Sequence, residues 1–266
     1  MPTTAFIGAG RMASAMARGL LRSGTAKPAQ LACIGGAGTS SLQLSQELGI
    51  RLASSPQALL EVVETVVVAC KPQVFAALDP AYGSLAQGKL IVSVLAGTRL
   101  DRLRAFFPRA RALVRVMPNT PGAIGQGISA WTSLAPLEDA DRDRLARLLA
   151  GLGDSVEVPE SQLDAVTAVS GSGPGFFFEF LAAYERGAIA LGLEPELARR
   201  LIRTTFVGSL ALADATGEPP ARLRDQVTSP NGTTRAGLDV LQGAHLDDLV
   251  ALALEAARDR ARELSR

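Results

Sequence analysis

The sequence predicts an α/β protein in which a doubly wound, mostly parallel sheet is followed by an all-helical domain. Between residues 3 and 159, short runs rich in aliphatic and β-branched residues alternate with helical patterns, as in βαβ units. A glycine-rich turn directly follows the first of these runs. Beyond residue 161 the runs stop, and stretches rich in Ala, Leu, Arg and Glu continue to the end. We therefore place the two domains at residues 1–160 and 161–266.

Seven runs are predicted to form the strands of the sheet, the last two less clearly than the others. In order they are TTAFI (3–7), QLACI (30–34), TVVVAC (65–70), LIVSVL (90–95), ALVRVM (112–117), ISAW (128–131) and SVEV (155–158). Helix starts between them are indicated by Pro56 after Ser55 and by Pro72 after Lys71, because the first helical turn accepts proline. The single tryptophan, Trp131, is expected in the core.

The second domain shows helical periodicity throughout. From residue 245 to 264, an apolar stripe that includes Leu246, Leu249 and Leu254 lies opposite charged residues such as Glu255 and Asp259. Two turn signals, GEPP at 217–220 and SPNG at 229–232, interrupt the helical pattern. The domain should therefore consist of several helices joined by short turns.

Composition excludes several function classes. No run approaches the roughly 18 apolar residues of a membrane span, and the opening MPTTAFIGAG lacks a basic targeting segment, so we expect a cytoplasmic protein without membrane contact. With 27 basic and 26 acidic residues, the chain has no basic field for nucleic acid. Residues 1–160 carry a charge of +4 and the rest −3, which fits an anionic ligand held mainly by the first domain.

Scarce residue types narrow the chemistry further. A single histidine, His245, leaves no two-histidine metal site, and we expect no bound metal. The only lysines are Lys27, Lys71 and Lys89, so the helical domain has no lysine acid or Schiff base. Both cysteines, Cys33 and Cys70, lie in apolar stretches and should be reduced thiols.

A dinucleotide fingerprint lies at the first strand-to-helix junction. Gly8, Gly10 and Ala13 form a G-x-G-x-x-A pattern that also includes Arg11 and Met12. Gly8 permits a tight turn, Gly10 lets a pyrophosphate approach the backbone, and Ala13 lets the helix pack close to the strand. The motif predicts a Rossmann-type dinucleotide-binding domain, and the alternative is a glycine turn with a structural role only.

The end of the second strand indicates which dinucleotide is bound. NAD-selective sites usually carry an acidic residue there, but residues 35–41 read GGAGTSS, and no carboxylate occurs before Glu47. Exposed amides and the hydroxyls of Thr39 and Ser40 could bind a 2′-phosphate. We therefore expect NADPH, with NADH possible, and the alternative is a loop without a role in selectivity.

Further motifs follow the later strands. They are CKPQ at 70–73, SVLAG at 93–97, MPNTP at 117–121, SGSGP at 170–174 and VTSPNGTT at 227–234. Together with the fingerprint, they resemble the pyrroline-5-carboxylate reductase family over essentially the whole chain. The segment at 227–234 is the most specific part of the resemblance, since glycine fingerprints occur in many oxidoreductases.

The resemblance implies transfer of a hydride from NAD(P)H to the C=N bond of 1-pyrroline-5-carboxylate, which gives L-proline in the last step of proline biosynthesis. It implies that the cofactor is lined by Ala69, Lys71, Pro72, Ala96, Gly97 and Asn119. The chain departs from the family at Asn231, where glycine is usual, and at Pro56, where many members have asparagine near the adenosine. Asparagine accepts a positive φ, so the first departure should be tolerated.

The segment SPNGTT has properties that suit this substrate. It reads as a turn that opens a helix, so the amides of Gly232, Thr233 and Thr234 should be unpaired donors for a carboxylate. We hypothesise that the Thr234 hydroxyl is the catalytic group that faces the ring nitrogen, and that Ser229 helps to fix the carboxylate. The alternative is that Thr233 and Thr234 only cap the helix.

Competing functions remain open at this point. A β-hydroxyacid dehydrogenase would need a lysine in the helical domain, which this chain lacks. The chain could instead be a reductase of another small cyclic imine or a noncatalytic NADP-binding sensor. Lys71 could be merely solvated, and His245 is not favoured as a general acid. The SGSGP segment is expected to be a closely packed helix entry near the nicotinamide pocket or a subunit contact.

Assembly into a homo-oligomer is expected. A helical domain with an exposed apolar stripe is costly for a single chain in water. The resemblance implies dimers formed through interlocked helical domains, which can stack into larger rings.

Overall fold

The computed structural model describes residues 3–36 and 38–265. These form two compact units, one made of Met1–Pro174 with Ala256–Arg266 and the other of Gly175–Glu255. The first unit thus includes short helices beyond residue 160 and the end of the chain. The domain limits at 160 and 161 stay a prediction.

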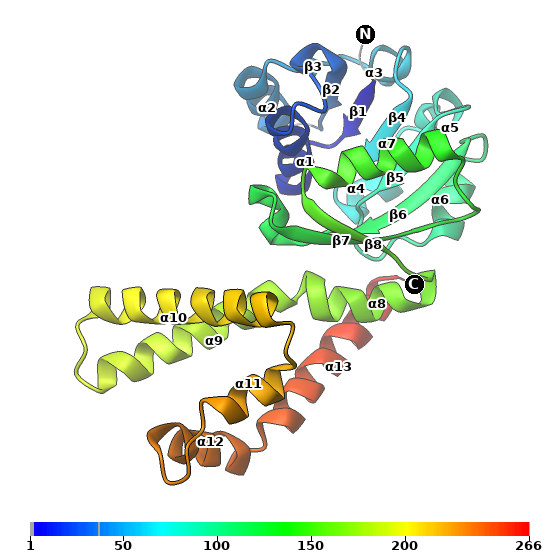
Figure 1. Ribbon diagram of the computed structural model, residues 1–266. Coiled ribbons are helices and arrows are strands. Elements are labelled where there is room, and N and C mark those ends of the chain that lie inside the picture. The colour runs from blue at the N-terminus through cyan, green and yellow to red at the C-terminus, as the bar shows by residue number, and fades with distance from the viewer. Residues whose placement is uncertain (1–2, 37, 266) are drawn as a thin grey trace. The chain divides into compact units, whose positions relative to one another are not determined.

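The first unit contains an eight-stranded sheet with the order β3-β2-β1-β4-β5-β6-β7-β8 (Figure 1). The strands are β1 (Thr4–Ile7), β2 (Leu31–Ile34), β3 (Arg51–Leu52), β4 (Thr65–Val68), β5 (Leu90–Ser93), β6 (Ala112–Met117), β7 (Gly127–Ser133) and β8 (Gly153–Glu157). All neighbours are parallel except β6 and β7. The first six strands have the order of a doubly wound dinucleotide-binding sheet, which confirms the predicted fold class.

All seven predicted runs form strands, and the sequence analysis missed only the two-residue β3. Helical elements connect the strands and follow the last of them. They are α1 (Arg11–Arg22), η1 (Pro28–Gln30), α2 (Ser40–Leu48), α3 (Pro56–Leu60), α4 (Pro72–Ala76), α5 (Ala81–Leu85), α6 (Leu100–Phe106), η2 (Thr120–Ile124), α7 (Asp139–Ala150), η3 (Glu160–Gln162), α8 (Leu163–Val166) and a π-helical turn, η4 (Thr167–Gly171). The prolines of α3 and α4 occupy the first turn as predicted, and Ser55 Oγ accepts a hydrogen bond from Ala58 N, 3.1 Å.

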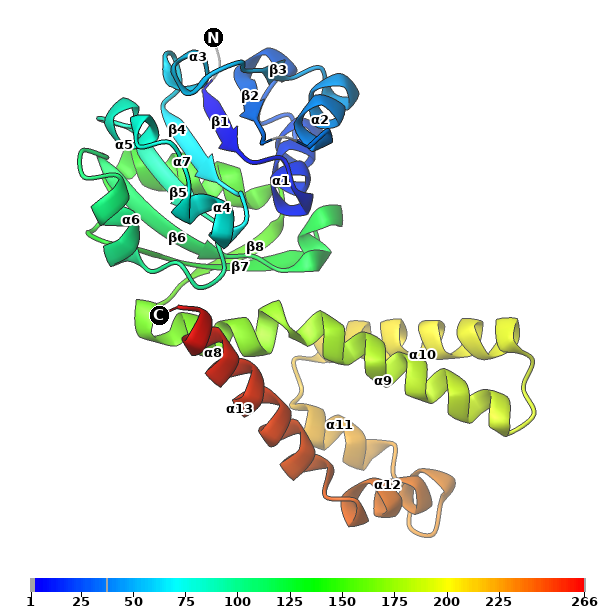
Figure 2. The same cartoon turned by 180° about the vertical axis from the view of Figure 1, so that it is seen from behind.

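The core of the first unit lies on both faces of the sheet, because strand side chains alternate between them. Phe6 and Val67 pack with α1, α2 and α7, and the buried Trp131 joins this cluster, as expected. Ala5 and Val66 point to the opposite face and pack with α3, α5 and α6. Figures 1 and 2 show the sheet between these two helical layers. Because these strands are parallel, their carboxyl ends lie at one edge of the sheet.

The second unit is helical, as predicted. It is built from α9 (Gly173–Ala190), α10 (Pro195–Thr216), α11 (Pro220–Gln226), α12 (Thr233–Gly243) and α13 (Leu246–Leu264), of which α9 begins in the first unit and α13 ends there. Both predicted interruptions are turns: Gly217 has φ 63° and ends α10, and Asn231 has φ 59°. Among the described residues, no helix is long and apolar enough to span a membrane.

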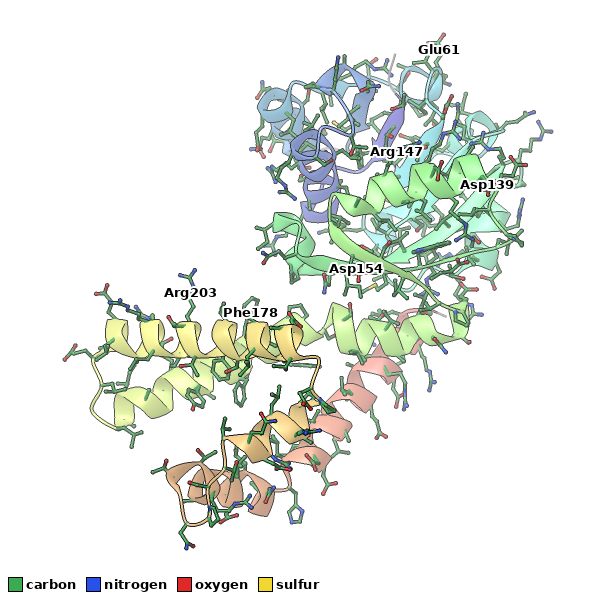
Figure 3. The ribbon with its side chains drawn as sticks, viewed as in Figure 1. Glu61, Asp139, Arg147, Asp154, Phe178 and Arg203 are labelled. Carbon is green, nitrogen blue, oxygen red and sulfur yellow. The ribbon has the colours of Figure 1, made fainter. Side chains whose placement is uncertain are left out.

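Much of the apolar surface of the second unit is exposed in the single chain. Phe178 projects from α9 with 62% of its surface exposed (Figure 3), and the stripe of α13 leaves Leu249 and Val250 exposed as well. A groove of about 730 Å³ is lined by apolar residues of α9 and α10, including Phe180, Tyr184 and Leu201. Apolar surface of this kind marks an interaction face.

Candidate cofactor and substrate site

Gly8 forms a turn that only glycine can make. Its φ is 101°, and a β-carbon there would lie 2.6 Å from Cys70 N and 2.8 Å from the Ala69 carbonyl carbon. Its N–H donates to Ile34 O, 2.8 Å. The loop after β1 is therefore pressed against the end of β4, as the predicted role of Gly8 requires.

The start of α1 offers open space and free donors. In the described part of the chain, a β-carbon on Gly10 would meet no atom within 4 Å. The first helical hydrogen bond runs from Ser14 N to Gly10 O, 2.9 Å, so the amides of Arg11, Met12 and Ala13 have no acceptor within the helix. The first turn carries no acidic residue. This arrangement fits a pyrophosphate, because helix N-terminal amides and the helix dipole attract anions.

The loop after β2 presents hydroxyl groups without carboxylates. Thr39 and Ser40 are exposed at the start of α2, and no side chain caps that helix. Ala37, in the middle of this predicted phosphate loop, lies outside the described residues. The exposed hydroxyls are compatible with the 2′-phosphate of NADP.

The loops after β4, β5 and β6 lie at the same edge of the sheet as Gly8, since these strands are parallel neighbours. Ala69 N donates to Ile7 O, 2.9 Å, while Lys71 is exposed at the start of α4 ahead of Pro72. Ala96 is exposed, and Gly97 has φ 72°. The predicted cofactor residues of the first unit are thus brought together at this edge.

The side chain of Asn119, predicted to line the cofactor, is partly engaged by the protein itself. Its side-chain oxygen accepts a hydrogen bond from Ile128 N, 3.0 Å, at the start of β7. The carbonyl of the side chain therefore holds the protein backbone, and the NH₂ group remains as the donor that could face a cofactor.

Burial makes the Cys70 thiol inert, since it raises the pKa of Cys70 from its usual 9.0 to about 11. The folded protein keeps this proton after the unfolded chain has lost it, so Cys70 should contribute stability below pH 9 that disappears between pH 9 and about 11. The free energy of unfolding, measured by chemical denaturation at several pH values in this range, should fall less steeply with pH for Cys70→Ala than for the parent protein. Equal slopes for the two proteins would contradict the prediction.

The segment from Ser229 to Thr234 lies in the second unit and forms the predicted turn into α12. The first helical hydrogen bond joins Ala236 N to Gly232 O, 3.1 Å, which leaves the amides of Thr233 and Thr234 without a helical acceptor. The Gly232 amide differs from the prediction, because it donates to Ser229 O, 3.1 Å, within the turn.

Capping alone does not explain the two threonines. Gly232, which has no side chain, is the N-cap residue of α12, so neither threonine occupies the capping position. Thr234 is exposed. The structure therefore leaves its hydroxyl available to a ligand, together with two free amides suited to a carboxylate.

The remaining candidates lie outside these clusters. His245 has φ 55° just before α13. Its side chain is exposed, and its Nδ1 lies 3.5 Å from Asp248 Oδ2. In the SGSGP segment, a β-carbon on Gly171 would lie 2.6 Å from Cε at the flexible end of Met117, whereas one on Gly173 would meet no described atom within 4 Å. Close packing of this segment therefore stays a prediction. The sequence analysis missed an ionic cluster around Arg115, although an arginine within the apolar run ALVRVM was a visible signal.

A doubly wound sheet with a glycine turn and free amides at the start of α1 defines a dinucleotide-binding protein of the Rossmann type. Two family models match the chain, "NADP oxidoreductase coenzyme F420-dependent" over residues 3–97 and "Pyrroline-5-carboxylate reductase dimerisation" over residues 160–264. Pyrroline-5-carboxylate reductase of Pseudomonas aeruginosa is 37% identical over 99% of this chain and 97% of its own, and pyrroline-5-carboxylate reductase 2 of Bacillus subtilis is 32% identical over 99% and 95%. The chain belongs to the pyrroline-5-carboxylate reductase family.

Solved structures agree with this assignment. A pyrroline-5-carboxylate reductase from Coxiella burnetii superimposes with a TM-score of 0.90 at 27% identity and covers 100% of this chain and 99% of its own. The Plasmodium falciparum pyrroline carboxylate reductase with NADP bound gives 0.89 at 25% identity, over 100% and 98%. An imine reductase from Streptomyces aurantiacus, at 16% identity and a TM-score of 0.56, shares the fold. The predicted family and the use of NAD(P)H are confirmed.

Proposed function

We propose that this chain reduces 1-pyrroline-5-carboxylate to L-proline with NADPH. The observation that carries the proposal is that reductases of this name match both units from end to end, 99% of this chain in the case of the P. aeruginosa relative. NADPH, when bound, would supply the hydride for the imine carbon, and the imine nitrogen would gain a proton. The side chains bind, orient and protonate the substrate.

In the first unit, the amides of Arg11, Met12 and Ala13 would hold the pyrophosphate above Gly10. Thr39 and Ser40 would bind the 2′-phosphate. The loops at Ala69, Lys71, Pro72, Ala96 and Gly97 would line the rest of the cofactor, with the Asn119 NH₂ group as a further donor. The open space at Gly10 and the free amides beside it support the pyrophosphate position. The roles of the later loops are those that the family resemblance implies.

In the second unit, the free amides of Thr233 and Thr234 would bind the substrate carboxylate, with Ser229 and Gly232 shaping the turn. The Thr234 hydroxyl would hydrogen-bond the ring nitrogen, orient the C=N bond and relay its proton. Two amides at a helix start stabilise an anion without needing a lysine, and the second unit contains none.

The decisive experiment is a steady-state assay that follows NADPH oxidation when pyrroline-5-carboxylate is added. We expect turnover to proline and a higher kcat/KM with NADPH than with NADH. Turnover only with other cyclic imines would favour the alternative imine reductase. Tight NADPH binding without oxidation would indicate the noncatalytic sensor.

We further propose that the protein assembles as a dimer or as a ring of dimers. The dimerisation model covers the whole of the second unit, and that unit exposes large apolar side chains. Light scattering after size-exclusion chromatography should give an even multiple of 27.7 kDa. A mass of one chain would refute the proposal.

The free thiols Cys33 and Cys70 suit a reducing compartment, which supports a cytoplasmic location.

A further inference from the structure

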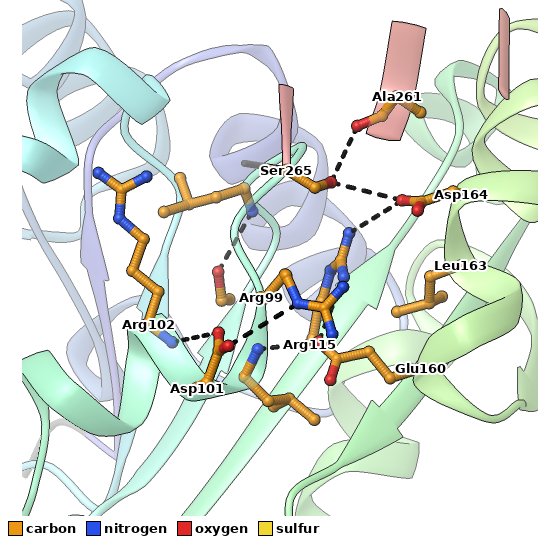
Figure 4. Close-up of polar contacts among 12 residues, drawn as sticks. Arg99, Asp101, Arg102, Arg115, Glu160, Leu163, Asp164, Ala261 and Ser265 are labelled. Atoms are coloured by element: carbon orange, nitrogen blue, oxygen red, sulfur yellow. Dashed lines mark hydrogen bonds and ion pairs between the residues drawn. The ribbon is translucent and has the colours of Figure 1, made fainter. Parts of the chain in front are cut away.

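An ionic cluster lies within the first unit (Figure 4). At its centre is Arg115 on β6, which is only 5% exposed. Its guanidinium lies 3.3 Å from Glu160 Oε1 and 3.8 Å from Asp164 Oδ1. A buried ion pair seldom adds net stability over apolar packing. Stability alone therefore does not explain why Arg115 and its two carboxylates are placed here.

Each carboxylate of this cluster also holds a second part of the chain. Glu160 Oε1 accepts a hydrogen bond from Leu100 N, 2.8 Å, at the first residue of α6. Asp164 Oδ1 lies 3.4 Å from Ser265 Oγ, at the end of the chain. Glu160 therefore links the start of α6 to Arg115. Asp164 links Ser265, directly after α13, to the same arginine. We call Arg115, Glu160, Asp164 and Ser265 the loop clamp.

The loop clamp encloses the loop after β5. Leu100 comes three residues after Gly97, and Leu264 precedes Ser265. A β-carbon on Gly97 would collide with Leu264 O and would lie 2.8 Å from the Leu264 carbonyl carbon. The end of the chain thus packs directly against the backbone of Gly97, and the other side of the loop is anchored at the Leu100 amide by Glu160.

The hydrogen bond to Leu100 also has an electrostatic role. The amide at the first residue of a helix has no acceptor within the helix, and a carboxylate there is favoured by the helix dipole. Glu160 supplies that carboxylate from a segment 60 residues further along the chain. Because this bond is charge-assisted and directional, it fixes where α6 begins and therefore the path of residues 96–99.

We propose that Glu160 and the end of the chain are positioning elements for the cofactor, acting through the loop Ala96–Gly97. The inference rests on the proposed function, since it takes this loop to line the nicotinamide nucleotide. In this proposal, the loop clamp acts on the cofactor only through that loop. Its effect is to keep the loop in the shape that binds the cofactor before binding occurs, which improves affinity by preorganisation.

The first test compares Glu160→Ala with Glu160→Gln in the full-length protein. Glu160→Ala should raise the Kd and KM for NADPH roughly tenfold, the effect of losing one charge-assisted hydrogen bond. It should change the KM for pyrroline-5-carboxylate much less. Glu160→Gln should restore most of the affinity, because its amide oxygen can still accept from Leu100 N. Glu157→Gln is a matched control, since Glu157 pairs with the exposed Arg142.

The second test concerns the end of the chain. A protein that ends at residue 263 should also bind NADPH more weakly, and Ser265→Ala should show a smaller loss. Glu263→Gln is the control, because Glu263 makes an exposed ion pair with Arg260 in the same turn. If Glu160→Ala does not fold, the NADPH affinities of these variants test the proposal in its place.

Unchanged NADPH affinity in the truncated protein and in folded Glu160→Ala would overturn the proposal, even if their melting temperatures fell. The Kd is measured by direct titration of NADPH without substrate. If the parent protein binds NADPH but does not reduce pyrroline-5-carboxylate, the proposed function fails while the positioning role can still be scored from the Kd values.

Discussion

Replacing Gly8 by alanine should destabilise the first unit and abolish cofactor binding. The φ of 101° is unfavourable for any residue with a β-carbon, and the new atom would lie 2.6 Å from Cys70 N. Backbone strain and overpacking together should lower the free energy of unfolding by about 2–6 kcal/mol. Chemical denaturation measures this change, and a variant of parental stability would contradict the geometry of the turn.

Gly10→Ala provides the matched comparison within the same motif. Gly10 has φ −76°, which alanine adopts without strain, and in the described structure its β-carbon would face open space. Stability should therefore stay within about 0.5 kcal/mol of the parent, whereas the Kd for NADPH should rise at least about tenfold because the methyl group would occupy the space of the pyrophosphate. Parental NADPH affinity would exclude the proposed phosphate position.

Thr234→Ala should lower kcat by about 10²-fold, the lower end of what a positioned proton-transfer group contributes. The side chain is exposed and does not occupy the N-cap position, which is Gly232, so the melting temperature should hardly change. Thr234→Ser should retain much of the activity because it keeps the hydroxyl.

Thr216→Ala is the control for this experiment. Thr216 is another exposed threonine of the second unit, and its hydroxyl donates to Leu212 O, 2.9 Å, in its own helix. It should leave kcat unchanged. Parental turnover of Thr234→Ala would remove Thr234 from the mechanism, whatever the result for Thr216.

The fold could be predicted because its signals are local. Alternating apolar runs indicated the strands, and the glycine turn marked the first crossover. Strand β3 has only two residues, Arg51 and Leu52, too short for any periodicity, and it exists through its pairing with β2. Similarly, the contact of Ser265 with Asp164 joins residues 101 positions apart, which no local pattern reveals.

The roles of the candidate site residues remain a prediction, and the hydrogen bonding of these residues could not be derived from the sequence. The motif identified Gly8 and Gly10 because backbone conformation and close approach depend on residue type. In contrast, the Asn119 oxygen is taken by Ile128 N, and the Gly232 amide by Ser229 O. Both bonds depend on the exact course of a loop in space, so sequence spacing alone could not distinguish bound from free donors and acceptors.

The aromatic side chains of the second unit have a consequence for folding. Phe206 contacts both Phe180 and Tyr184 edge to face, yet Phe180 and Tyr184 remain 42% and 54% exposed. If a second copy covers them, part of the hydrophobic free energy is gained only when two chains meet. The thermal midpoint should then rise with protein concentration, and dilute protein should lose its helical unit first.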